Sequence, residues 1–188
     1  MITYQHLPDC PCPVNDISIF NHMFESTSAI HISMPIETLC PIFVNWLENK
    51  NLYPSFLEIF YLPADCKVRH IHTDLDHITK QASKINYIIG GEDAPMQWFS
   101  VNNSTNAVTA VNYAPTYTNK DQTSPFLYWT REQCTLINET ILSGPNLIHA
   151  GIPHVVFTKT KPRIAISVVL KDVHTKQRLS CEEVIARL

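Results

Sequence analysis

From residue 55 onward, hydrophobic and polar residues alternate over short runs that are rich in β-branched and aromatic side chains. Runs of this kind, bounded by turn-forming residues, are typical of β-strands. The segments Gly90-Gly91 and Ser143-Gly144-Pro145 are strong turn signals between such runs. The pattern predicts strands over 56–62, 67–73, 84–89, 96–101, 126–138, 146–149, 153–158 and 163–170.

Before these runs, the apolar residues of 36–48 recur at the spacing of one helix face. Ser33 and Pro35 suit the start of a helix there. Pro41 conflicts with that start, because a proline inside a helix removes a backbone hydrogen bond. The sequence therefore predicts a helix that either kinks at Pro41 or begins later.

A second, short helix is expected at the C-terminus, because Ser180 and Glu183 have the spacing of a capping box. Residues 102–125 are rich in Asn, Thr, Ser, Tyr and Pro and predict a long loop, which in a compact domain is often functional. A helical N-terminal region followed by about eight short strands favours a mainly β protein, either a sandwich or a jelly roll. The length of 188 residues suits a single domain, 1–188, with its β core at about 56–170.

Composition narrows the classes of partner. Hydrophobic residues make up 45% of the chain, charged residues 16%, and the net charge is −3. No basic run favours a nucleic-acid partner. No stretch reaches the about 18 apolar residues of a membrane helix, and the N-terminus lacks the pattern of a signal peptide. We expect a cytoplasmic protein without a membrane partner, with six cysteines as free thiols. For Cys10 and Cys12, which lie two residues apart, metal binding is the alternative to two free thiols.

Histidine is the unusual feature of the composition. Five of the nine histidines fall in two clusters: His70, His72 and His77, then His149 and His154. In a strand, residues i and i+2 point to the same face, so His72 and Asp74 project together. Asp76 competes as the carboxylate, but its distance from His72 along the chain fits a helix. His70 shares the face of His72 and either lines the mouth of a site or lies at the surface.

Two further candidates lie in the last predicted strands. His154 opens an apolar strand, and Arg163 opens the next one, nine residues later. A hairpin between them would bring Arg163 opposite His154, and Ser167 would share the face of Arg163. We prefer His154 to His149 as a metal ligand, because a ligand on a strand is held more firmly than one on a loop. A buried arginine beside a metal calls for an anion, for which a bidentate carboxylate is suited.

Two histidines and one carboxylate with open coordination positions form the facial triad of non-heme Fe(II) oxygenases. The hypothesis is that His72, Asp74 and His154 hold Fe(II) and that 2-oxoglutarate and O₂ take the open positions. Arg163 and Ser167 would hold the distal carboxylate of 2-oxoglutarate. Asn86 is a candidate for contact with this cosubstrate or a nearby water, with a solvent-facing role as its alternative.

The order of these motifs resembles the 2-oxoglutarate/Fe(II) oxygenase superfamily. The stretches HTDLDHITKQASKINYIIGG, MQWFS and GIPHVVFTKTKPRIAIS are similar to small viral and bacterial members, and the resemblance covers about residues 56–170. It implies a double-stranded β-helix, or jelly roll, with a flanking N-terminal helix and a short C-terminal helix. It also implies iron ligands at His72, Asp74 and His154 and the cosubstrate arginine at Arg163. One departure is the serine, which in many relatives lies two residues after the arginine, where this chain has Ala165.

The resemblance implies a hydroxylase that couples decarboxylation of 2-oxoglutarate to the oxidation of a small molecule or side chain. Two alternatives stay open. A cupin-type isomerase or dioxygenase would bind the metal without 2-oxoglutarate and would give Arg163 no role. A non-catalytic jelly-roll binding module would make the histidines incidental. Neither the substrate nor the oligomeric state is predicted.

Overall fold

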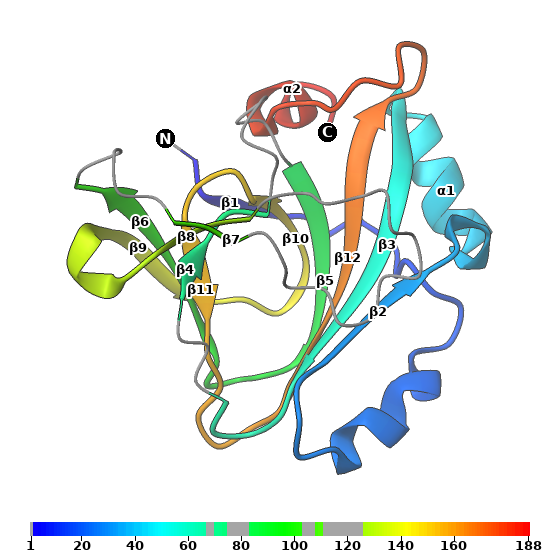
Figure 1. Ribbon diagram of the computed structural model, residues 1–188. Helices are drawn as coiled ribbons and strands as arrows, with labels where there is room; N and C mark the ends of the chain where they lie inside the picture. Colours follow the sequence, from blue (N-terminus) through cyan, green and yellow to red (C-terminus); the bar gives the residue numbers. More distant parts are fainter. Residues whose placement is uncertain (1, 67–69, 75–82, 103–107, 111–125) are drawn as a thin grey trace.

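The computed structural model describes residues 2–66, 70–74, 83–102, 108–110 and 126–188, which form two six-stranded antiparallel sheets (Figure 1). Sheet A runs in the order β1 (Tyr4–His6), β10 (Gly144–His149), β5 (Ser83–Gly90), β12 (Arg163–Asp172), β3 (Leu52–Leu62) and β2 (Ile30–Met34). Sheet B runs in the order β7 (Val108–Ala110), β8 (Phe126–Trp129), β4 (Ile71–His72), β11 (His154–Val156), β6 (Pro95–Val101) and β9 (Cys134–Ile141). The prediction of a mainly β protein is confirmed.

The N-terminal helix begins later than residue 36. A 3-10 turn, η2 (Ile36–Thr38), is followed by α1 (Pro41–Glu48), whose N-cap is Cys40. Pro41 therefore occupies the first helical position, where its missing N–H removes no hydrogen bond. A start near Ser33 is wrong, because that residue belongs to β2.

The C-terminal helix is confirmed as α2 (Cys181–Ile185). The Ser180 hydroxyl accepts a hydrogen bond from the Glu183 N–H, and the Glu183 carboxylate accepts one from the Ser180 N–H. This reciprocal capping box satisfies two backbone donors at the helix start.

Several predicted boundaries shift. The strand predicted over 126–138 divides into β8 and β9, because a 3-10 turn, η4 (Arg131–Gln133), with its own capping box from Thr130, lies between them. β7 lies inside the loop predicted over 102–125. The rest of that loop from residue 103 onward, with 67–69 of the strand predicted over 67–73, falls outside the described residues. A 3-10 helix, η1 (Ile17–Glu25), and the strands β1 and β2 were not predicted.

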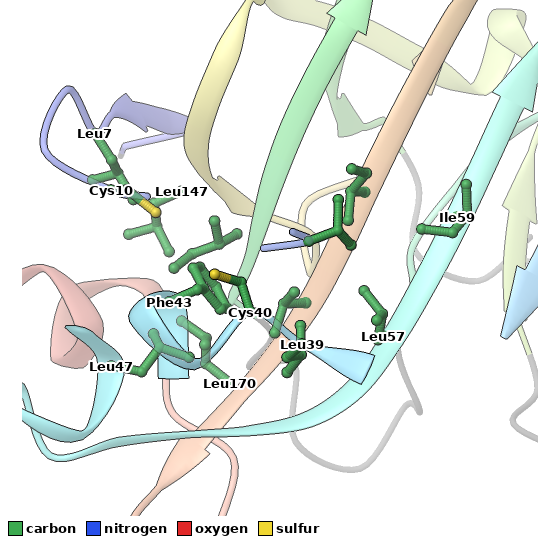
Figure 2. Packing of buried hydrophobic residues seen from close by; sticks show 14 of the residues in the cluster. Leu7, Cys10, Leu39, Cys40, Phe43, Leu47, Leu57, Ile59, Leu147 and Leu170 are labelled. Atoms are coloured by element: carbon green, nitrogen blue, oxygen red, sulfur yellow. The ribbon is translucent and has the colours of Figure 1, made fainter. Parts of the chain in front are cut away.

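The outer face of sheet A carries the larger hydrophobic cluster. Alternate residues of β12 enter it, and α1 covers it with Phe43 and Leu47, both fully buried. Figure 2 shows side chains from the N-terminal segment, α1, β3 and β12 gathered on this side. The β12 residues in this cluster are Ile164, Ile166, Val168 and Leu170. This face stabilises the fold through apolar burial.

The inner face of sheet A packs on sheet B. Ile88, Ile148 and Ala165 of sheet A share one buried cluster with Met96 and Trp98 of sheet B. The Tyr4 ring stacks on Trp98 with ring centroids 5.7 Å apart. The two sheets therefore form a sandwich, and polar side chains inside it need partners within the molecule or from a ligand.

All six cysteines are free thiols, as the sequence predicts. Burial raises the pKa of Cys10 to about 12, so that thiol stays protonated at neutral pH. Within the described ranges, no helix has the length and hydropathy needed to cross a bilayer.

Candidate metal centre

Strands β4 and β11 bring two histidines together. His72 and His154 are direct partners across this antiparallel pair, and their ring centroids lie 4.8 Å apart. Asp74 follows β4, where its N–H donates to the Ala150 carbonyl at 3.1 Å. One Asp74 oxygen lies 3.3 Å from His72 Nε2 and the other lies 3.7 Å from His154 Nε2. The ligand atoms of all three residues fall within 4.8 Å of one another, so this cluster can hold a metal ion.

The orientation of His154 suits a metal ligand. Its Nδ1 lies 2.8 Å from the Ile152 carbonyl, which only accepts, so Nδ1 carries the proton and Nε2 keeps its lone pair toward Asp74. Burial lowers the pKa of His154 to about 4, so the ring is neutral at neutral pH. In His72, Nδ1 makes a longer contact, 3.4 Å, with the His70 carbonyl. Imidazole nitrogens and a carboxylate are donors that Fe(II) and other divalent transition metals accept.

A buried lysine, which the sequence reasoning missed, reaches the cluster. Lys84 Nζ lies 3.2 Å from Asp74 Oδ2 and 3.1 Å from Glu58 Oε2. The Lys84 side chain is 6% exposed, and that of Glu58 is 14% exposed. The available signal was the strand period, which places Lys84 on the same face as Asn86, together with the charge of Glu58 inside the apolar run FLEIFYL.

These charges determine the protonation of the cluster. Burial alone would raise the pKa of Asp74, but the Lys84 ammonium and the hydrogen bond with His72 outweigh it and hold that pKa well below its usual range. Burial alone would lower the pKa of Lys84, and the carboxylates of Asp74 and Glu58 raise it instead. At neutral pH the cluster therefore combines a carboxylate ligand with a cation beside it.

The hairpin predicted between His154 and Arg163 does not form. His154 belongs to sheet B, whereas Arg163 pairs with Leu62 and Gly90 in sheet A. The intervening chain crosses from one sheet to the other. It is held there by Asp93, whose carboxylate accepts hydrogen bonds from the N–H and hydroxyl of Thr160 at 2.7 and 2.6 Å. Arg163 reaches the sandwich interior through the alternation of β12 and not through strand pairing with His154.

Arg163 is buried at 4% exposure, and none of the described residues forms an ion pair with it. Its aliphatic stem packs on Gly91, where an added Cβ would lie 2.8 to 3.0 Å from three of its side-chain carbons. Gly91 also has φ of +70°, which favours glycine. Burial lowers the pKa of Arg163 to about 10, so the guanidinium is still charged at neutral pH. An unpaired buried cation of this kind is suited to an anionic ligand.

Two of the other predicted residues lie side by side on the inner face of sheet A. Ser167 and Asn86 are direct partners across β12 and β5. Ser167 Oγ and Asn86 Oδ1 are both buried without a hydrogen-bond partner. Because Ser167 lies four residues after Arg163 on one strand, both side chains share this face. A ligand between the sheets would satisfy these atoms.

Among the described residues, the predicted candidates His149 and His70 do not join the cluster. His149 ends β10 in sheet A, and burial lowers its pKa. His70 is exposed before β4, with its ring edge-on to Tyr128 at 5.8 Å. The competing carboxylate Asp76 and the loop residue His77 lie outside the described residues.

Searches of protein-family models, curated proteins and solved structures found no match to this chain. The functional inference therefore depends on the geometry of the site. That geometry is a mainly β sandwich with a His72–Asp74–His154 cluster that can hold a metal ion.

Proposed function

We propose that this protein is an Fe(II)- and 2-oxoglutarate-dependent oxygenase with a double-stranded β-helix core, and specifically a hydroxylase. One observation carries the proposal. A two-histidine, one-carboxylate cluster lies in the same sandwich as Arg163, a buried arginine without an ion-pair partner among the described residues. A buried positive charge without a partner in the protein calls for an anionic ligand, and 2-oxoglutarate would supply a carboxylate for it.

The three residues would hold the metal ion and leave coordination positions for 2-oxoglutarate and O₂. His72 and His154 present Nε2, and Asp74 presents a carboxylate oxygen. When bound, Fe(II) and 2-oxoglutarate supply the oxidation, in which decarboxylation of the cosubstrate is coupled to O₂ activation. The protein would position these groups, and the buried side chain of Trp98 lies on the strand position paired with His154.

The inner face of sheet A supplies the groups for the cosubstrate. Arg163 pairs with its distal carboxylate, and the Ser167 hydroxyl donates to the same group. Asn86 Oδ1 is an acceptor and cannot bind a carboxylate oxygen. It accepts instead from a bound water or from a donor on the substrate, which is a small molecule or a side chain.

The test is an anaerobic titration. We expect metal-stripped protein to take up one Fe(II) and, after addition of 2-oxoglutarate, to develop the weak visible charge-transfer band of the chelate. Oxygen should then convert 2-oxoglutarate to succinate. His154→Ala is the matched control and should show no band.

Two results would contradict the proposal. Iron uptake without a band or succinate would indicate a metal enzyme of another class. Absence of iron uptake would leave a binding module with incidental histidines.

A further inference from the structure

Lys84 occupies an unusual position, because it is a cation in direct contact with a metal ligand. Its Nζ lies 3.2 Å from Asp74 Oδ2 and 3.1 Å from Glu58 Oε2. Its Nζ lies over the Phe60 ring, 5.7 Å from the ring centroid. Ion pairs and this aromatic contact thus hold the ammonium in a position that the facial triad itself does not require.

Glu58, one of the two carboxylates that pair with Lys84, also contacts the more exposed side chain of His31. Glu58 Oε1 lies 3.2 Å from His31 Nε2, and His31 stacks on Phe60 with ring centroids 4.4 Å apart. Side-chain exposure rises along the row, from 6% at Lys84 to 14% at Glu58 and 31% at His31. Lys84 is therefore the least exposed member of a row of side chains that runs from Asp74 through Lys84 and Glu58 to His31.

The Asp74 side chain is only 19% exposed, and a carboxylate that has lost most of its solvent is stabilised by a neighbouring cation. Without a metal ion, the fold would be less stable if this charge were unpaired. Lys84 supplies the cation in the protein alone. When a divalent ion binds, two cations compete for one carboxylate, and the ammonium repels the incoming ion. Glu58 moderates this repulsion, because it offers Lys84 a second carboxylate.

We propose that Lys84 is a built-in counter-ion of the metal centre, which stabilises the metal-free fold and weakens metal binding, and that Glu58 opposes this effect. Lys84 is a positioning residue, since it acts through Asp74. The inference depends on the metal-binding part of the proposed function and is independent of 2-oxoglutarate.

The test measures Fe(II) and Co(II) affinity anaerobically in competition with a chromophoric chelator, together with the thermal midpoint with and without metal. Lys84→Met should bind metal about tenfold tighter or more, because the competing charge is gone. Its metal-free midpoint should fall and should recover when metal is added. Glu58→Gln should bind metal several-fold more weakly.

Two controls separate a local effect from a general one. Lys84→Arg keeps the charge and should stay within about threefold of the wild-type affinity. Lys161→Met removes the same charge from an exposed loop and should change neither affinity nor midpoint.

The two charge variants should move metal affinity in opposite directions, whereas loss of a purely structural ion pair would move both the same way. Equal or weaker binding by Lys84→Met would overturn the inference. If Lys84→Met folds only with metal present, the inference is supported. If it does not fold at all, an unchanged or tighter affinity in Glu58→Gln would overturn it.

The outcomes also distinguish this inference from the proposed function. A wild-type protein that binds no divalent metal would overturn both. Opposite shifts in the two variants, in a protein that gives no 2-oxoglutarate band, would support the counter-ion and overturn the oxygenase.

Discussion

The two faces of sheet A are made by the same strands and differ in the polar side chains that they bury. Along β12, Ile164, Ile166 and Val168 point outward into an apolar cluster in which each is fully buried. Arg163 and Ser167 point inward, where the guanidinium has no described ion-pair partner and the hydroxyl makes no hydrogen bond. Apolar contact satisfies the outer face, whereas the inner face buries polar atoms that no hydrogen bond among the described residues satisfies.

Neighbouring residues of one strand therefore serve different purposes, since those on the outer face contribute to stability and those on the inner face are suited to binding. A sequence that only had to fold would place apolar side chains on both faces of a buried sheet. The inner face instead buries a lysine in contact with Asp74, together with an arginine, an asparagine oxygen and a serine hydroxyl. Departures of this kind from good folding chemistry are expected where a protein binds its ligands.

The largest expected effect is loss of the metal centre. His154→Ala removes one of three ligands and should abolish Fe(II) uptake at micromolar metal, because two ligands hold the ion too weakly. His149→Ala is the matched control, since His149 lies on sheet A outside the cluster. Inductively coupled plasma spectrometry after desalting measures the stoichiometry. If His154→Ala retained the metal and His149→Ala lost it, the ligand would be His149 on β10, and its assignment to β11 would be wrong.

On the outer face, Ile166→Ala should destabilise the fold by about 2–5 kcal/mol, the usual cost of a large-to-small change in a core. Ile166 is fully buried among the residues of the outer cluster. Urea unfolding measures the free energy, and iron stoichiometry at low temperature should be unchanged. A folded variant that loses its metal would show that the two faces are coupled.

On the inner face, Arg163→Ala should weaken 2-oxoglutarate binding by about 100-fold, because a charge-assisted pair in a buried site is lost. Metal affinity should change little, since Arg163 forms no pair with the metal ligands. Titration of the charge-transfer band measures the cosubstrate affinity. Arg187→Ala removes a surface arginine that pairs with Asp172 at 2.8 Å and should leave this affinity unaltered. If Arg163→Ala binds within threefold of wild type, the cosubstrate is held elsewhere.

Much of the difference between the outer and inner faces of sheet A follows from local sequence patterns and could be predicted. The period of two along 163–170 indicates which β12 residues share a face, and the His72-x-Asp74 spacing places two ligands together. The capping boxes at Ser180 and Thr130 each mark the start of a helix with residues that lie three apart in the chain. Only the box at Ser180 was predicted from the sequence. Such signals depend on neighbours in the chain.

The contacts between distant strands could not be predicted in the same way. The crossing of 157–162 between the sheets leaves no local signal, because residues that hydrogen-bond to that segment, Asp93 and Cys66, lie 67 and 92 residues from their partners along the chain. Lys84 and Glu58 were missed for a related reason, since each is an ordinary charged residue until the fold places both beside Asp74. Propensity and periodicity describe an element, whereas the site depends on how elements pack.

Ser167→Ala should have only a small effect on stability, and it tests whether a polar group on the inner face of sheet A contributes to folding. Ser167→Ala removes a buried hydroxyl that makes no hydrogen bond, so it should change stability by less than about 0.5 kcal/mol or stabilise the fold slightly. Ser83 is the matched control on the neighbouring strand, because it is equally buried and its hydroxyl donates to the Leu179 carbonyl at 3.1 Å. Ser83→Ala should cost about 0.5–1.5 kcal/mol, the net worth of one hydrogen bond. Urea unfolding of both variants in metal-free buffer makes the measurement. If Ser167→Ala were as destabilising as Ser83→Ala, the Ser167 hydroxyl would be part of the folded framework and not a group reserved for a ligand.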